Sequence, residues 1–326
     1  METPEVLLRP APSDRPVAAP VTRSARETAG LAWGLLGVVI FAMTLPMTRL
    51  AVGPAEAPQL SPLFVAAGRA ALAGLLSLAY LGIVRAPWLA RRHWPALAVS
   101  AAGTVVGFPL FLGLALREVD AMHAAVVTGV LPLATAIAAA LHFRQRPSGA
   151  FWACAVAGCA LVIGFAALKG SGHLSAADGL LLLAVASAAV GYVGGAKVSA
   201  SVPAEQVICW VLVASLPLTM PVMLIHWPTQ PVGAPAWGGF AYVTVFSMWL
   251  GFFAWYRGLA LGGTVRVSQV QLVQPFAALL FAVPVLGERL DALTLGCALA
   301  VVATVFVGKR LPVHAALPAV APASRA

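Results

Sequence analysis

Residues 106–116 read VGFPLFLGLAL, and residues 250–261 read LGFFAWYRGLAL. After a short polar turn, each stretch leads into a long apolar run with one central proline, Pro132 in the first run and Pro275 in the second. Earlier in each half, MTRLAV at 47–52 corresponds to GAKVSA at 195–200. The common order and spacing of these matches indicate that the second half of the chain repeats the first.

Ten apolar runs of about the length that crosses a bilayer occupy most of the chain. They lie near 30–48, 62–84, 94–115, 122–142, 149–167, 178–198, 206–226, 236–256, 266–286 and 292–308. The runs lack the strict alternation of barrel strands, so helices fit them. Because a five-helix unit has an odd number of spans, its copy enters the membrane from the other side. The sequence therefore predicts an all-α integral membrane protein with ten transmembrane helices, arranged as two inverted five-helix repeats around a central cavity.

The composition supports this class, because 61% of the residues are hydrophobic and only 10% are charged. A soluble domain carries about 25% charged residues to cover its surface. The spans divide the chain into a first repeat at 29–168 and a second at 177–308. Residues 1–28 and 309–326 are rich in proline and small residues, and we expect them to form disordered cytoplasmic tails.

The positive charges orient the ten spans. With both ends of the chain in the cytoplasm, all but five of the 20 Lys and Arg residues fall on the cytoplasmic side or in the tails. The exceptions are Arg69 within a span and, on the opposite side, Arg49, Arg117, Lys169 and Arg289. The positive-inside rule favours this orientation. The basic balance thus indicates membrane topology and anionic lipid as a partner, and no motif supports a nucleic-acid partner.

Several short motifs, in this order, resemble the EamA-type transporters of the drug/metabolite transporter superfamily over roughly residues 30–308. They are Ala-Gly-Arg at 67–69, Gly-Leu-Ala-Leu at 113–116 and 258–261, the two mid-span prolines and Leu-Gly-Glu-Arg-Leu at 286–290. The resemblance implies a basket-like fold whose cavity opens to one side at a time. It also implies movement of small metabolites, amino acids or drugs, often outward, across a bacterial inner membrane. The first half departs from the pattern with Phe-Arg-Gln-Arg-Pro at 143–147, so strictly symmetric gating is not expected.

Arg69 is the one charged residue well inside a span, about 12 Å along its helix from Ser61. A central arginine is expensive in a bilayer and is usually functional or paired. One interpretation is a contact to a substrate carboxylate or a gating partner. The other is an arginine that pins neighbouring helix ends through their carbonyl groups. The residues alone do not separate the two.

Span nine holds the most polar stretch of the membrane region, with Ser268, Gln271 and Gln274 on one helix face beside Pro275. Amide groups on one face cannot face lipid at low cost, so they face the cavity or bond to another helix. Pro275 and Pro132 are predicted to kink their helices. The repeat places Thr128 opposite Gln271, so the polar recognition surface is expected to be weighted to the second half.

Tyr192 in span six is a further candidate for the cavity wall, because it lies beside a face of small residues that favours close helix packing. The predicted substrate-binding set is therefore Arg69, Thr128, Tyr192, Ser268, Gln271 and Gln274. The acidic residues Glu118, Asp120, Glu288 and Asp291 are placed at the outer rim rather than at depth, which leaves ion coupling open.

The sequence offers no Walker A motif, zinc pair or nucleophile elbow, so no catalytic residue, metal site or cofactor is predicted. The leading hypothesis is a secondary transporter of small organic solutes by alternating access, with export favoured and a homodimer as one expected assembly. An uptake permease is the nearest alternative. A non-transporting membrane scaffold and an intramembrane enzyme are alternatives from other classes.

Overall fold

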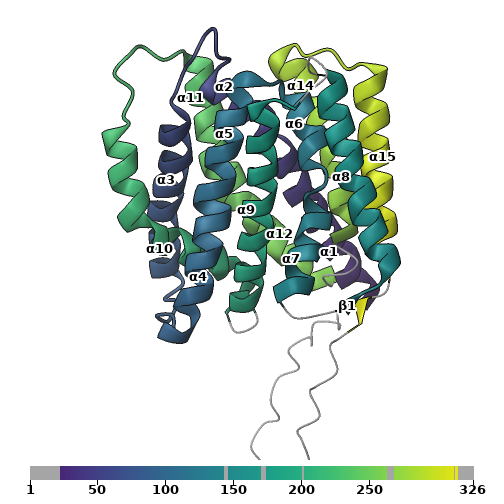
Figure 1. Ribbon diagram of the computed structural model, residues 1–326. Helices are drawn as coiled ribbons and strands as arrows, with labels where there is room; N and C mark the ends of the chain where they lie inside the picture. Colours follow the sequence, from purple (N-terminus) through teal and green to yellow (C-terminus); the bar gives the residue numbers. More distant parts are fainter. Residues whose placement is uncertain are drawn as a thin grey trace, which may run out of the picture.

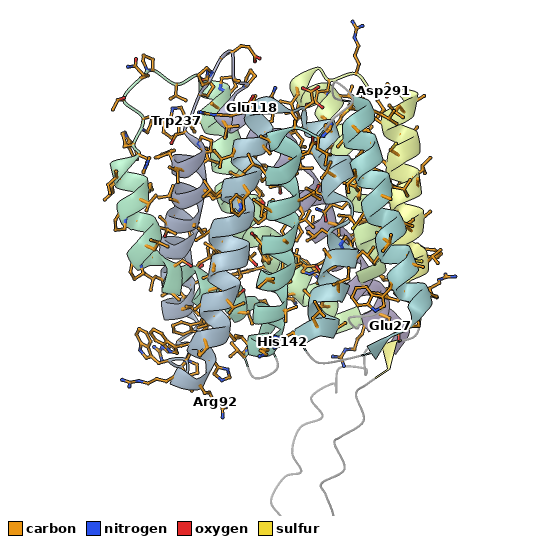
Figure 2. The ribbon with its side chains drawn as sticks, viewed as in Figure 1. Glu27, Arg92, Glu118, His142, Trp237 and Asp291 are labelled. Atoms are coloured by element: carbon orange, nitrogen blue, oxygen red, sulfur yellow. The ribbon has the colours of Figure 1, made fainter. Side chains whose placement is uncertain are left out.

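The computed structural model describes residues 23–142, 146–169, 174–199, 202–262, 268–311 and 313–314. This part of the chain forms a bundle of helices that run between two ends (Figure 1). Trp237, Glu118 and Asp291 lie at one end, and Arg92, His142 and Glu27 lie at the other (Figure 2). We call these the Asp291 end and the Arg92 end of the bundle.

The first half of the chain supplies five spans. Its elements are α1 (Arg23–Ala42), α2 (Thr44–Val52), α3 (Pro62–Ile83), the 3-10 turn η1 (Arg91–His93), α4 (Trp94–Ser100), the π-helical segment η2 (Ala101–Gly107), α5 (Phe108–Glu118), α6 (Ala121–Thr128), α7 (Leu131–His142) and α8 (Gly149–Lys169). The first span consists of α1 and α2, the third of α4, η2 and α5, and the fourth of α6 and α7.

The second half has the same plan. Its elements are α9 (Ala176–Ser199), α10 (Ala204–Ile225), α11 (Ala234–Tyr242), the π-helical segment η3 (Val243–Leu250), α12 (Gly251–Gly262), the 3-10 segment η4 (Ser268–Val273), α14 (Gln274–Leu286) and α15 (Ala292–Arg310). Across the described residues, eight helices are long and apolar enough to span a membrane, and Val270–Leu286 and Ala292–Gly308 are shorter apolar helices. The prediction of an all-α membrane fold with ten spans is confirmed.

The packing follows the inverted repeat. Helix α1 packs along α12, and α9 packs in the same way along α4, η2 and α5. A two-fold axis that exchanges spans one and six, and spans three and eight, converts the first contact into the second. The same operation maps the α3–α10 and α8–α15 pairs onto themselves. Both π-helical segments lie at equivalent places, in spans three and eight.

Glycines allow the two equivalent contacts to be close. A Cβ atom on Gly258 of α12 would lie 2.6 Å from the backbone nitrogen of Gly34 in α1. On the other side of the axis, a Cβ on Gly191 of α9 would lie 2.6 Å from the backbone nitrogen of Thr104 in η2. Small residues of this kind let membrane helices approach backbone to backbone. Gly258 belongs to the second Gly-Leu-Ala-Leu motif, which gives that motif a packing role.

The two mid-span prolines do more than bend their helices. Pro132 is the second residue of α7, which starts after α6 has ended at Thr128. Pro275 is the second residue of α14, where the 3-10 segment η4 gives way to an α-helix. Proline lacks an N–H group and is tolerated in a first helical turn, where that group has no acceptor. The predicted kinks are therefore a break in span four and a change of helix type in span nine.

The chain ends differ from the predicted tails. Helix α1 already begins at Arg23, so residues 23–28 are helical, as expected for a stretch rich in Ala, Arg and Glu. Helix α15 extends to Arg310, and strand β2 (Val313–His314) pairs antiparallel with β1 (Arg146–Pro147). Residues 1–22 and 315–326 of the predicted tails lie outside the described residues. Both α1 and α15 reach the Arg92 end, as an even number of spans requires (Figure 1).

Candidate functional site

A cavity of about 60 Å³ lies inside the bundle, between side chains of both halves. Its wall is formed by Phe41, Thr44, Leu45, Arg69, Thr104, Phe108, Pro109, Thr128, Leu131, Ala188, Tyr192, Ser247, Met248, Phe252 and Gln274. These residues come from spans one, two, three, four, six, eight and nine. Sites for drug-sized ligands measure about 300–1,000 Å³, so the cavity is smaller than such a site in this structure.

Arg69 is the centre of the cavity's polar network. It lies seven residues after the start of α3 and is only 3% exposed. Its Nη2 atom donates a hydrogen bond of 2.9 Å to Ser247 Oγ, and Ser247 Oγ lies 2.8 Å from Thr44 Oγ1. The Nε and Nη1 atoms have no hydrogen-bond partner among the described residues. The structure thus ties Arg69 to the hydroxyl groups of α2 and η3 rather than to backbone carbonyls.

Gln271 and Gln274 of span nine face the interior of the bundle. Gln274 lines the main cavity, and both Gln271 and Gln274 line a neighbouring pocket of about 30 Å³. Gln271 lies in η4 and Gln274 is the first residue of α14, three positions further along the chain, so the two side chains lie about one helical turn apart. The side chain of Ser268 lies outside the described residues, so its predicted role has no structural counterpart here.

Thr128 and Tyr192, the remaining candidates, also lie on the cavity wall. Thr128 is at the end of α6, where its hydroxyl donates 2.7 Å to the carbonyl of Ala124, and it borders both pockets. The structure therefore brings Arg69, Thr128, Tyr192 and Gln274 to one cavity and Gln271 to the next.

Three cavity hydroxyls were missed by the sequence argument: Thr44, Thr104 and Ser247. Hydroxyl residues are common in membrane helices, and many only bond to their own helix backbone. Ser215, whose Oγ donates 2.7 Å to the carbonyl of Val211, is such a case. Residue type alone does not separate the two groups. The described wall carries polar residues of both halves, Thr44, Arg69, Thr104 and Thr128 from the first and Tyr192, Ser247 and Gln274 from the second. Because Ser268 is not among the described side chains, the weighting to the second half stays a prediction.

The aromatic residues of span eight fall into two groups, one that lines the cavity and one that packs against other helices. Phe252 lines the cavity together with Phe41, and the two rings meet edge to face with centroids 5.0 Å apart. Trp255 packs against α1, and Trp249 contacts the rings of Tyr80 and Phe253. Only part of this helix therefore faces the cavity, and the rest packs against neighbouring helices.

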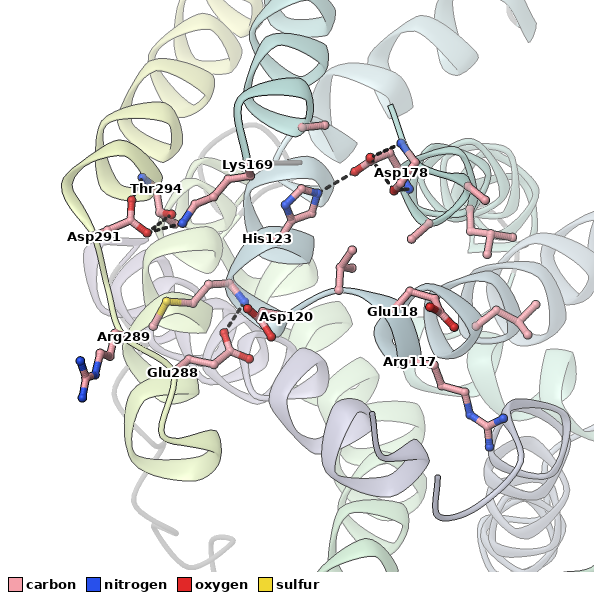
Figure 3. A pocket seen from close by; sticks show the side chains of 18 residues that line it. Arg117, Glu118, Asp120, His123, Lys169, Asp178, Glu288, Arg289, Asp291 and Thr294 are labelled. Carbon is pink, nitrogen blue, oxygen red and sulfur yellow. Dashed lines mark hydrogen bonds and ion pairs between the residues drawn. The ribbon is translucent and has the colours of Figure 1, made fainter. Parts of the chain in front are cut away.

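A larger hollow of about 850 Å³ opens at the Asp291 end (Figure 3). Charged side chains of both signs surround it, and three polar contacts across it join the two halves. His123 lies 2.6 Å from Asp178, Lys169 pairs with Asp291, and Glu288 binds the start of α6. Asp178, which is 3% exposed, is a rim carboxylate that the sequence argument did not single out.

Glu288, the glutamate of the Leu-Gly-Glu-Arg-Leu motif, caps a helix of the other half. Its two carboxylate oxygens accept hydrogen bonds of 2.8 Å each from the backbone N–H groups of Ala121 and Met122. These N–H groups belong to the first turn of α6 and have no acceptor within the helix. Burial raises the pKa of the Glu288 carboxyl above its ordinary value, although both hydrogen bonds act to lower it. Glu288 borders both the large hollow and a second one of about 500 Å³.

The model of the EamA-like transporter family matches residues 28–167 and, a second time, residues 175–308. The chain belongs to the EamA-like transporter family. It is 42% identical over 287 residues to the uncharacterized transporter YdeK of Bacillus subtilis strain 168, a match that covers 87% of this chain and 98% of YdeK. A shorter match of 31% identity over 127 residues, 38% of this chain and 35% of the relative, is to the inner membrane protein YtfF of Escherichia coli strain K12.

The fold of this EamA-like transporter also resembles that of a protein with a solved crystal structure. The TM-score is 0.56 at 20% identity, over 87% of this chain and 96% of the other, which supports the fold alone. Membership of the family identifies the chain as a multi-pass integral membrane transporter. The described residues contain no group of three or more His, Cys, Asp or Glu side chains that could hold a metal ion.

Proposed function

We propose that this EamA-like transporter moves small organic solutes through the central cavity by alternating access, with export as the favoured direction. The observation that carries the proposal is a buried polar cavity to which both halves contribute, through Arg69 and Thr44 on one side and Tyr192, Ser247 and Gln274 on the other. Secondary transporters built from inverted repeats place their substrate sites at such an interface.

The proposed membrane is the bacterial cytoplasmic membrane, with the Arg92 end in the cytoplasm. The distribution of Lys and Arg along the sequence supports this orientation. The preference for export rests on the family resemblance, since the geometry of the cavity does not distinguish the two directions.

The contacts at the Asp291 end suggest how access alternates. The large hollow at that end shares no lining residue with the central cavity. For the cavity to open there, the contacts of Glu288 with α6 and of His123 with Asp178 must break, because they join the two halves at that end. The two repeats, 29–168 and 177–308, would then move relative to each other largely as rigid units.

Flux measurements in sealed vesicles test the proposal. Purified protein is reconstituted, and a panel of labelled amino acids, sugars, organic acids and drugs is followed in both directions. We expect at least one class of solute to move faster than in empty vesicles. Gln274→Leu should change the transport kinetics, whereas Gln206→Leu, at the start of α10 and away from the cavity wall, should not. No flux above that of empty vesicles for any solute would overturn the proposal.

A further inference from the structure

The positive charge of Arg69 has no counter-charge inside the described part of the protein. The guanidinium carries five N–H groups, and the one hydrogen bond it makes to a described residue goes to the neutral hydroxyl of Ser247. Nε and Nη1, with three of these N–H groups, have no partner among the described residues. No described Asp or Glu forms an ion pair with Arg69. A buried, unpaired charge is costly, so the site is incomplete without an anion.

Among the described residues, the remainder of the cavity wall is uncharged. Apart from Arg69, the polar groups on it are the hydroxyls of threonine, serine and tyrosine and one glutamine amide, and the rest is apolar or aromatic. A ligand with one negative group can therefore satisfy Arg69 while its other atoms contact Phe41, Phe108 and Phe252. A ligand cation would find no acidic side chain on this wall.

We propose that the ligand class of this cavity is a monocarboxylate with an uncharged, mainly apolar remainder, held by Arg69 through its carboxylate. The inference rests on the proposed transport function and narrows its substrate. Arginine is suited to this role because its planar array of N–H groups matches the two oxygens of a carboxylate. An α-amino acid should bind less well than the carboxylic acid of the same skeleton, because its ammonium group would be desolvated without a counter-charge.

The ligand must also be small, or the cavity must widen around it. The present volume of about 60 Å³ is less than the 150 Å³ or so that accommodates benzene in an engineered protein cavity. A series of carboxylates of increasing size therefore measures how far the cavity expands on binding.

Ligand-induced thermal stabilisation of the full-length protein in detergent micelles tests the charge requirement directly. Each carboxylate from ethanoate to 3-phenylpropanoate, with 4-methylpentanoate among them, is compared with its primary amide and with the corresponding amine. Leucine serves as the form of 4-methylpentanoate that carries an α-ammonium group. We expect stabilisation by at least one carboxylate and weaker or no stabilisation by its amide, its amine and the amino acid. Sodium chloride at equal concentration is the test for a site that accepts any anion.

Variants of Arg69 identify the residue responsible. Arg69→Gln should weaken carboxylate binding roughly 10- to 100-fold, the usual range for loss of hydrogen bonds to a charged group, and should remove the preference over the amide. Arg69→Lys keeps the charge and should bind with intermediate affinity. Arg257→Gln, an exposed arginine that lies over Trp33 outside the cavity, is the matched control and should bind like the original protein.

Three results would overturn the inference: no carboxylate binds, an amide or amine binds as well as its carboxylate, or chloride stabilises equally. The comparison of carboxylates with their amides and amines on the wild-type protein tests the inference even if the Arg69 variants fail to fold. Failure of the inference is distinguishable from failure of the transport proposal. In the first case other solutes still move in vesicles, and in the second carboxylates still bind the purified protein although nothing is transported.

Discussion

Replacing Glu288 by glutamine should loosen the first turn of α6. In the structure, both carboxylate oxygens accept 2.8 Å hydrogen bonds, from the N–H groups of Ala121 and Met122. Glutamine keeps one acceptor oxygen but turns an NH₂ group toward the second N–H group, which loses its acceptor. A buried donor without an acceptor costs about 1–3 kcal/mol. Loss of the negative charge at the helix N-terminus costs about 0.3–1 kcal/mol more.

Relief of the buried charge opposes these costs, because burial disfavours the Glu288 carboxylate and raises its pKa. We therefore expect a net loss of about 1–2 kcal/mol in the free energy of local opening, which corresponds to roughly 5- to 30-fold faster amide exchange in α6. Hydrogen–deuterium exchange with mass spectrometry measures this on peptides that cover residues 121–128. Glu118→Gln, an exposed glutamate on the same hollow, is the control and should leave the exchange of α6 unchanged.

Acid should act in the opposite sense to the glutamine substitution, because a protonated carboxyl keeps acceptor capacity on both oxygens, whereas an amide has only one acceptor oxygen. A raised pKa means that the capped conformation binds a proton more tightly than a solvated Glu288 does. The contribution of the protonated carboxyl to the capped conformation is therefore fully present below its ordinary pKa of 4.5 and is lost as the pH rises through the raised value. After correction for intrinsic exchange, α6 should be better protected at the lower pH in the original protein and independent of pH in Glu288→Gln. Equal amide exchange of α6 in the original protein, Glu288→Gln and Glu118→Gln at both pH values would refute the reasoning.

Three further predictions follow from single contacts. Gly258→Ala should lower the melting temperature, because its Cβ would lie 2.6 Å from a backbone nitrogen of α1. Overpacking of this kind costs about 1–3 kcal/mol. The control Gly296→Ala, whose Cβ meets open space, should not lower the melting temperature. Ser247→Ala removes the hydroxyl that pairs with the buried arginine of the cavity and should cost about 1–3 kcal/mol in thermal unfolding. Lys169 and the first turn of α15 lower the pKa of Asp291 to about 2. Its contribution to stability is therefore present above pH 3.8 and lost toward about pH 2, so the melting temperatures of Asp291→Asn and the original protein should converge in acid.

The spans and their repeat could be predicted from the sequence because the bilayer imposes them. Each crossing needs a long apolar run, and an odd repeat unit must invert. Arg69, Thr128, Tyr192 and Gln274 lie on the cavity wall, and their part in binding a substrate stays a prediction. Arg69 and Gln274 could be placed in the interior because a charge or an amide within an apolar helix must face the interior of the bundle. Thr128 was placed by the repeat, and Tyr192 by the neighbouring face of small residues.

The polar network could not be predicted, because its partners are far apart in the chain. Thr44 and Ser247 are separated by 203 positions, and their contact depends on how α2 packs against the π-helical segment η3. The helix cap made by Glu288 has the same character. The sequence placed this residue at the rim, but the two N–H groups that its carboxylate binds lie in α6, which belongs to the other repeat.

The two ends of the bundle are joined by different chemistry, and this bears on gating. At the Asp291 end, Glu288 connects the halves through a titratable group. The corresponding segment of the first repeat, residues 143–147, includes β1, which pairs through its backbone with β2 after the last helix. A backbone pair does not change with pH, whereas a carboxylate cap does. Among the described residues, the two halves are therefore joined by a carboxylate cap at the Asp291 end and by the β1–β2 backbone pair at the Arg92 end, although the helices of the two repeats are related by symmetry.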